Sequence, residues 1–253
     1  MIRIIKSSEP PSVLKDNCSE WTKNLDDAVN KYGAYSKIPK DEKEKLLKYY
    51  RLKEIQDELA KASYRKCAFC ECIPSEGGNL EVEHFAPKSL YHKLTFEWDN
   101  LLPICRKCND SKSNHDTIKE PILNPSIDDT EKYIDFNLIN MVAKGDTEYY
   151  EKASLTIDVC SLNGTRLLKA RADLLVRLSE YQQKLSQCLK EIEQASTERI
   201  KSNKIRKLKE SIETIEELGD KSEKYSLFSK RFLEKSQEYF EAKEILNNIN
   251  NDN

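Results

Sequence analysis

Residues 64–115 read YRKCAFCECIPSEGGNLEVEHFAPKSLYHKLTFEWDNLLPICRKCNDSKSNH, and this stretch decides the fold. It contains two Cys-x-x-Cys pairs, Cys67 with Cys70 and Cys105 with Cys108. Two such pairs are typical of a tetrahedral zinc site, because the turn inside each pair lets both sulfurs face one ion. We therefore predict that the four thiolates bind one structural Zn²⁺.

The residues between the cysteine pairs predict a small unit of two strands and a helix. A Gly-rich turn is predicted at residues 75–78, followed by a strand over residues 80–84 that ends in His84. The returning strand is expected over residues 101–104, and the second cysteine pair leads into a helix that begins around Asn109. The stretch is thus a strand–loop–strand–helix unit, held by zinc at both ends.

Helical patterns flank this unit on both sides. Before it we predict a short strand over residues 1–6, a helix from Ser12 to a stop at Gly33, and a second helix from Asp41 to about Ser63. After it we predict an irregular connector over residues 121–125, a hairpin over 133–141 and a short helix over 155–162. Three longer helices are predicted over residues 165–195, 197–218 and 223–246. The sequence therefore predicts an α+β fold, mainly α, with segments at residues 1–63 (strand and helical platform), 64–125 (zinc module), 126–163 (connector) and 164–253 (helical region).

Composition limits the class of protein. The chain has 253 residues, of which 34% are charged, and its mean hydropathy is −0.74. No apolar run approaches 18 residues and no leader pattern is present, so we expect no membrane span and a cytoplasmic location. Eight cysteines are also compatible with four disulfides in a secreted protein, but the paired spacing favours reduced thiols.

Several motifs in the central stretch resemble the zinc-stapled HNH endonucleases, whose fold is called ββα-metal. They are CAFC at residues 67–70, VEH at 82–84, WDNLL at 98–102 and CRKCNDSK at 105–112. The longer string EHFAPKS, LTFEWDNLLPIC and ILNPSIDD resembles a narrower group. These are the HNH subunits of Septu-type anti-phage systems and their retron-associated relatives, called PtuB. That resemblance extends from Met1 to about Arg171.

The resemblance implies a catalytic site in this module. His84 is the expected general base, a task that suits imidazole because its pKa lies near neutral pH. Asn100 is expected to fix the loop and orient His84. Glu83 and Asn109 are the expected ligands of a catalytic Mg²⁺ or Mn²⁺, since carboxylate and amide oxygens are the ligands that Mg²⁺ prefers.

Four cations are expected to contact substrate phosphates, namely Lys88, Arg106, Lys107 and Lys112. The narrower group leads us to expect Arg near position 86, where this chain has Ala86. That phosphate contact is therefore expected either to be missing or to be supplied by Lys88.

The resemblance implies a Mg²⁺-dependent phosphodiester hydrolase, the nuclease effector of an anti-phage system, working with an ABC/SMC-like ATPase. DNA is the favoured substrate. RNA, including tRNA, is an alternative, and a catalytically silent zinc-binding subunit that bridges partner and nucleic acid is another.

A basic run in the C-terminal region is the remaining feature. Residues 163–209 contain twelve Lys or Arg against five Asp or Glu. Such an excess is typical of a phosphate-binding track, and an ordinary solvated helix surface explains it equally well. A third interpretation is a docking surface for the ATPase. The candidate track is Arg199, Lys201, Lys204, Arg206 and Lys207.

Overall fold

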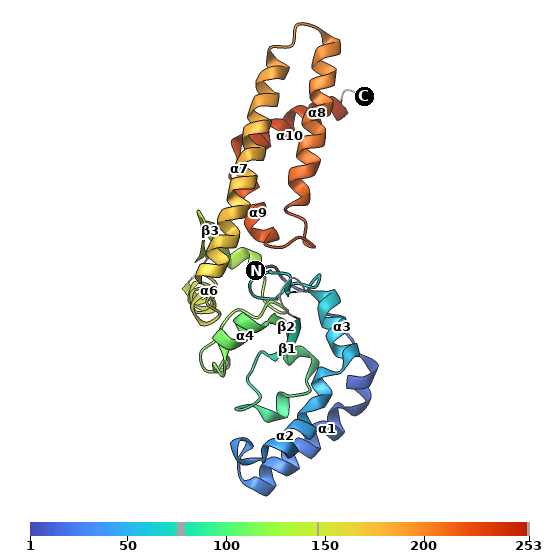
Figure 1. Ribbon diagram of the computed structural model, residues 1–253, viewed down its shortest axis with the longest axis vertical. Helices are drawn as coiled ribbons and strands as arrows, with labels where there is room; N and C mark the ends of the chain where they lie inside the picture. Colours follow the sequence, from blue (N-terminus) through green and yellow to red (C-terminus); the bar gives the residue numbers. More distant parts are fainter. Residues whose placement is uncertain (75–78, 146, 252–253) are drawn as a thin grey trace. The chain divides into compact units, whose positions relative to one another are not determined.

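The computed structural model describes residues 1–74, 79–145 and 147–251 (Figure 1). It confirms the predicted class, because helices predominate and only two small two-stranded sheets accompany them. The chain forms two compact units, Met1–Asp135 with Met141–Gly164, and Phe136–Asn140 with Thr165–Asn253. We call them the N-terminal unit and the C-terminal unit. The turn predicted at residues 75–78 lies outside the described residues.

The first helix, α1 (Ser12–Tyr32), has the predicted bounds. Its apolar positions Leu14, Trp21 and Leu25 are buried on one face. Gly33 ends the helix with φ of 76°, a left-handed conformation that glycine adopts without steric cost. α1 is therefore an amphipathic helix that faces the core of the N-terminal unit.

The second predicted helix is in fact three elements, so the prediction of one continuous helix to residue 63 was wrong. These are α2 (Lys40–Leu47), the 3₁₀ helix η2 (Lys48–Arg51) and α3 (Lys53–Ala62). Leu52 separates η2 from α3 with φ of −60° and ψ of 145°, and an extended residue interrupts the helical hydrogen-bond ladder. Asp41 lies in the first turn of α2 rather than capping it.

Residues 1–6 do not form the predicted strand. The amide of Ile4 donates to the carbonyl oxygen of Pro125 at 2.8 Å, but no strand is assigned here in the part of the chain that the structure describes. Ile2 and Ile4 are buried. Their apolar pattern therefore reflects burial of an extended segment rather than pairing in a sheet.

The central module has the predicted order of elements. Strand β1 (Leu80–His84) pairs antiparallel with β2 (Leu101–Cys105), in a register that places His84 opposite Leu101. Helix α4 (Arg106–Lys112) follows β2 directly and begins three residues before the predicted start, because the extended Cys105 already serves as its N-cap. Two short 3₁₀ helices, η4 (His92–Leu94) and η5 (Trp98–Asn100), shape the loop between the strands.

The module packs on the helical platform through one hydrophobic core. Val82, Phe96 and Leu101 of the module join the core that includes Ile55 and Leu59 of α3. Burial of these side chains away from water provides the main driving force for this packing. The core therefore holds η2 and α3 against β1, where the candidate site lies.

The connector contains α5 (Thr130–Tyr133), β3 (Ile134–Asn137), β4 (Asn140–Ala143) and α6 (Thr147–Val159). Strands β3 and β4 form the predicted hairpin. Helix α6 begins eight residues before the predicted start. The ring of Tyr149 stacks on Tyr133 at 4.1 Å, a contact that supports the additional turns.

The C-terminal unit contains α7 (Thr165–Glu193), α8 (Glu198–Glu217), α9 (Ser226–Leu233) and α10 (Gln237–Asn251). Helices α7 and α8 lie side by side and bury leucine and isoleucine side chains on both helices (Figure 1). The last predicted helix is divided into α9 and α10. The hydroxyl of Ser236 accepts from the amide of Tyr239 at 3.2 Å and starts α10 as a separate helix. Among the described residues, no helix has the length and apolar character needed to span a membrane.

Candidate metal centre and active-site cavity

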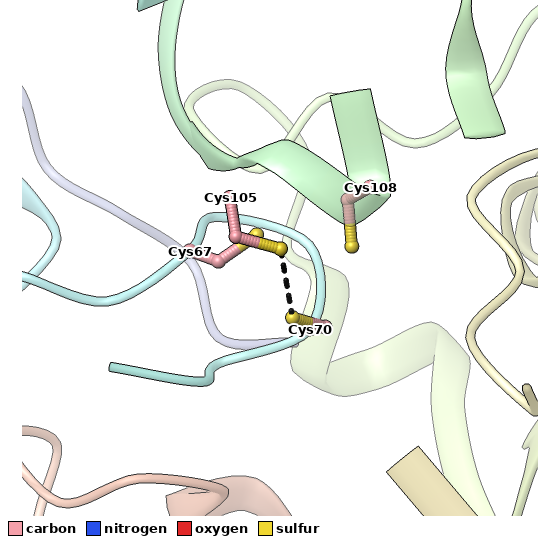
Figure 2. Close-up of side chains that lie close together, drawn as sticks. All are labelled: Cys67, Cys70, Cys105 and Cys108. Carbon is pink, nitrogen blue, oxygen red and sulfur yellow. Dashed lines mark hydrogen bonds between the residues drawn. The ribbon is translucent and has the colours of Figure 1, made fainter. Parts of the chain in front are cut away.

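The four cysteines of the two Cys-x-x-Cys pairs meet in one buried cluster (Figure 2). The sulfurs of Cys67, Cys70, Cys105 and Cys108 all lie within 4.8 Å of one another. Those of Cys70 and Cys105 are 3.8 Å apart. This arrangement is compatible with a tetrahedral zinc site, as the spacing predicts.

A local backbone bond closes the turn that carries the first cysteine pair, and the second pair lies at the start of α4. In the first turn, the amide of Glu71 donates to the carbonyl oxygen of Cys67 at 2.9 Å, and Glu71 has φ of 61°. The amide of Ala68 donates to Pro103 of β2 at 2.9 Å, which ties this turn to the second pair. Burial raises the pKa of the Cys67 thiol well above its usual value. A divalent cation would offset that cost by holding the sulfurs as thiolates, so the donor set fits Zn²⁺.

His84 ends β1 with its ring buried at 1% exposure. Its Nε2 lies 3.0 Å from the carbonyl oxygen of Thr95, which can only accept, so Nε2 carries the proton. Nδ1 is then the unprotonated nitrogen, and it is buried without a hydrogen-bond partner among the described residues. Burial, reinforced by the charges of Lys88, Lys112 and Arg51, lowers the pKa of His84 to about 3.

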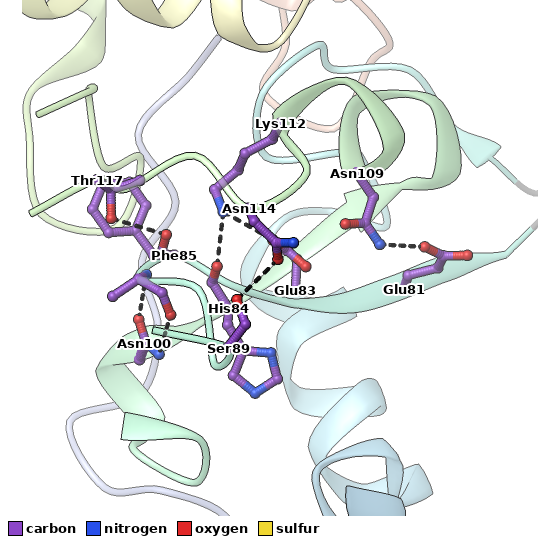
Figure 3. A network of polar contacts seen from close by, with 11 residues as sticks. Glu81, Glu83, His84, Phe85, Ser89, Asn100, Asn109, Lys112, Asn114 and Thr117 are labelled. Carbon is purple, nitrogen blue, oxygen red and sulfur yellow. Dashed lines mark hydrogen bonds and ion pairs between the residues drawn. The ribbon is translucent and has the colours of Figure 1, made fainter. Parts of the chain in front are cut away.

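Asn100 ties together the loop that follows His84 (Figure 3). Its side-chain oxygen accepts from the amide of Ala86 at 2.7 Å, and its side-chain nitrogen donates to Ala86 at 3.1 Å and Leu94 at 2.9 Å. The backbone carbonyl oxygen of Asn100 accepts from Phe85 at 2.8 Å. The structure thus places Asn100 beneath the loop rather than in the cavity, and the loop leads directly to Thr95, the partner of His84.

Two carboxylates of strand β1 lie on the same face as the side-chain amide of Asn109 on α4. Glu81 and Glu83 are two residues apart on a strand, and such side chains project from the same face. The side-chain nitrogen of Asn109 donates to Glu81 at 2.6 Å (Figure 3). Sequence reasoning missed Glu81, although its i, i+2 relation to Glu83 was a usable signal.

The ammonium group of Lys112 is buried beneath Glu83. It lies 2.9 Å from Oε1 of Glu83 and 2.9 Å from the carbonyl oxygen of His84. Lys112 was expected to contact phosphate, but in this structure its donors are directed to these two groups. Lys107, on the same short helix, is exposed and lies outside the cavity lining.

A cavity of about 480 Å³ is lined by residues of β1, α4 and the platform and brings most of the candidate residues together. The predicted site residues that line it are Glu83, His84, Lys88, Arg106 and Asn109. Asn100, Lys107 and Lys112 are outside the lining. The cavity is completed by residues that sequence reasoning did not single out, including Glu81 of β1 and Tyr50, Arg51 and Gln56 of the platform.

Comparison with known proteins agrees with this geometry. Residues 67–115 match the model of the HNH endonuclease family. This segment of the chain is therefore similar to HNH endonucleases. The matched segment contains the cysteine cluster, the site residues of β1 and β2, and α4. We call this segment the HNH module.

Two curated relatives resemble the chain over more of its length. A Septu protein PtuB from Bacillus thuringiensis is 42% identical over 106 residues, which is 42% of this chain and 39% of the relative. A Septu protein PtuB from Bacillus mycoides (strain KBAB4) is 27% identical over 204 residues, 68% of this chain and 66% of the relative. The chain thus spans between about two fifths and two thirds of the length of these relatives. The predicted resemblance to an HNH endonuclease of the PtuB group is confirmed.

The cations near the cavity differ in whether they are already paired. Arg106 donates to Glu81 at 3.2 Å and pairs with Asp110 at 2.9 Å. Ala86, where the resemblance led us to expect Arg, is buried and held by Asn100. Lys88 is therefore the cation that this loop supplies to the cavity.

Proposed function

We propose that the protein is a metal-dependent HNH endonuclease that hydrolyses phosphodiester bonds in nucleic acid. The observation that carries this proposal is the orientation of His84. Its Nε2 is bound to the Thr95 carbonyl and its Nδ1 lacks a partner among the described residues, in a cavity that also contains Glu81, Glu83 and Asn109. A fixed imidazole that lines the same cavity as three side chains with oxygen ligands is suited to activating water near a bound divalent ion.

His84 would act as the general base. The bond from Nε2 to Thr95 fixes the tautomer, so Nδ1 presents its lone pair for the proton of the attacking water. Because the pKa of His84 is lowered to about 3, the ring is neutral throughout the physiological pH range. The imidazole is therefore in its unprotonated form, although a pKa this far below neutral pH makes it a weaker base than an ordinary histidine.

The carboxylates and amide of the cavity fit a hard divalent ion. Glu83 and Asn109, with Glu81 beside them, would hold Mg²⁺ or Mn²⁺ through oxygen atoms. Lys112 bonds to Oε1 of Glu83, which leaves Oε2 as a ligand atom. When bound, such an ion neutralises charge on the scissile phosphate and its leaving oxygen. Lys88 and Arg106 would bind phosphate groups at the cavity.

The relatives suggest the biological setting. Both are Septu proteins, which supports a role as the nuclease subunit of an anti-phage defence system. We propose that the protein acts in the cytoplasm on DNA, together with an ABC/SMC-like ATPase. RNA, including tRNA, remains the alternative substrate, and the test below includes it.

The test is cleavage of plasmid DNA and total RNA by the purified protein, with and without the ATPase, in Mg²⁺ or Mn²⁺. We expect DNA cleavage that is abolished by His84→Ala, Glu83→Gln and Asn109→Ala, with zinc content unchanged. Asp99→Asn is the matched control, because Asp99 is 92% exposed and outside the cavity lining. Cleavage of RNA alone would favour the alternative substrate. Intact DNA and RNA under all conditions would instead indicate a silent bridging subunit.

A further inference from the structure

Arg51 reaches the active-site cavity from outside the HNH module. It is the last residue of η2 in the platform, far from β1 in sequence, yet it lines the same cavity as His84 and Glu83. Its Nε and one terminal nitrogen donate to the phenolic oxygen of Tyr50 at 3.1 Å and 2.9 Å. Among the described residues it forms no ion pair with a carboxylate. Arg51 therefore adds to the cavity lining a positive charge that no carboxylate in the described residues pairs with directly.

Tyr50 fixes this charge relative to the general base. The Tyr50 ring is buried and packs edge-on against the imidazole of His84, with ring centroids 4.6 Å apart. The phenolic oxygen of the same side chain accepts the two bonds from Arg51. One rigid aromatic side chain thus contacts both the imidazole and the guanidinium.

Lys88 adds a second charge on the same side. Its ammonium lies 5.6 Å from the centre of the Tyr50 ring. It too has no carboxylate within ion-pair distance in the described part of the chain. Around the cavity, the acidic side chains come from β1, while these two unpaired cations lie around Tyr50. The lining therefore offers oxygen ligands in one place and anion-binding groups in another.

We propose that Arg51, positioned by Tyr50, binds a phosphate group of the nucleic acid beside His84. The helical platform would then be part of the substrate site rather than only a support for the HNH module. Guanidinium groups suit this task because their planar set of donors matches phosphate oxygens. Arg51 still has donors that Tyr50 does not use. The inference rests on the proposed function, since it names a residue that holds the substrate of that site.

The experiment measures binding separately from cleavage. Every variant is made in the full chain with His84→Ala, and affinity for a labelled DNA duplex is measured over a range of salt concentrations. Arg51→Gln is compared with Arg51→Lys and Tyr50→Phe. Lys53→Gln is the matched control, because Lys53 is a neighbouring exposed cation outside the cavity lining and its loss changes the net charge equally.

We expect Arg51→Gln to weaken binding about tenfold to a hundredfold, as for loss of a charged hydrogen bond. The slope of log affinity against log salt should fall by about 0.9, the value for one phosphate contact. Arg51→Lys should recover part of the affinity, and Tyr50→Phe should lose part of it because the guanidinium is no longer held. Lys53→Gln should stay within about twofold of the parent. Thermal melting of each variant checks that the fold is intact.

The outcomes separate this inference from the proposed function. If Arg51→Gln binds as tightly as Lys53→Gln while the wild-type protein cleaves DNA, the Arg51 assignment is overturned and the hydrolase stands. If the wild-type protein binds DNA through Arg51 but cleaves neither DNA nor RNA, the hydrolase fails and the phosphate contact stands. Absence of measurable DNA binding by the parent at low salt would overturn the contact as well.

Discussion

The ammonium nitrogen of Lys112 lies 2.9 Å from Oε1 of Glu83, and both side chains are nearly inaccessible to water, with exposures of 0% and 9%. The same nitrogen donates to the carbonyl oxygen of His84 at 2.9 Å. A buried cation on α4 thus holds the two adjacent residues of β1 on which the proposed chemistry depends. Lys112 is a positioning residue in this arrangement.

Replacing Lys112 with Met should destabilise the protein by about 3–5 kcal/mol, because the carboxylate of Glu83 would remain buried without its partner. DNA cleavage should fall as well, since Glu83 would no longer be held. Urea unfolding and a cleavage assay measure the two effects. Lys107→Met on the same helix is the control, and at this exposed position the change should be within about 0.5 kcal/mol. Wild-type stability of the Lys112→Met protein would show that the ion pair does not hold β1.

Zinc should be required for the fold of the N-terminal unit. Cys105→Ser should release the ion and lower the melting temperature substantially, because zinc binding in small zinc-finger peptides is worth about 10–16 kcal/mol. Metal analysis and thermal melting of the purified protein test this. The control is Cys188→Ser on α7, which lies outside the cysteine cluster. A Cys105→Ser protein with full zinc content and unchanged melting would contradict the assignment.

The buried imidazole predicts a pH dependence of stability. The pKa of His84 is lowered from 6.5 to about 3 in the folded protein, so the unfolded chain binds the additional proton first as the pH falls. Stability from this group is therefore fully present above pH 6.5 and is lost progressively between that value and about 3. Between pH 7.5 and 5.5 the loss should be about 1.4 kcal/mol, one pKa unit of differential protonation.

Urea unfolding in buffer without added Mg²⁺ measures this effect as a difference between the wild-type protein and His84→Gln. Taking the difference cancels the contributions of the other titrating groups, the zinc-binding cysteines included. The stability advantage of the wild-type protein should shrink on acidification. A difference that stays constant from pH 7.5 to 5.5 would mean that His84 titrates normally and is not buried as described.

The basic run on α8 should contribute to nucleic-acid binding. Lys204 forms an ion pair with Glu191. Arg206 forms an ion pair with Glu210, with a nitrogen–oxygen distance of 3.2 Å. Arg199, Lys201 and Lys207 are exposed, and none has a carboxylate within ion-pair distance in the described residues. Reversal of these three charges to Glu should weaken DNA binding and flatten its salt dependence by about 0.9 for each lost phosphate contact.

The competing interpretation makes the same surface a docking site for the ATPase. In that case the triple reversal should prevent co-purification of the two proteins and leave DNA affinity unchanged. A triple reversal of Lys40, Lys45 and Lys53 on the platform is the control for a general charge effect, because these side chains are also exposed. If neither binding changes in the α8 variant, its basic run is an ordinary solvated surface.

The sequence alone determined the parts of the protein that depend on local spacing. Two residues between paired cysteines predict that each pair turns both sulfurs toward one ion, because the turn itself places them on one side. Two such pairs together indicated a four-sulfur site, and the tertiary structure brings the pairs into one cluster. The alternation of apolar and polar residues, with the turn residues beside it, predicted bounds for β1 and β2 that are close to the observed ones. Gly33 predicted the end of α1. The motif around His84, Asn100 and Asn109 located the HNH module, because it too is a pattern of residue spacing along the sequence.

Only the tertiary structure decided which distant residues share the cavity and what each partner is. Leu52 divides the platform helix, which no local pattern indicated, and packing of Ile55 and Leu59 against the module brings Tyr50 and Arg51 beside His84. The same packing buries Lys112 against Glu83 instead of leaving it at the surface. Sequence spacing reports on geometry within one turn or strand. Contacts between elements follow from burial of the shared core, which is a property of the whole chain.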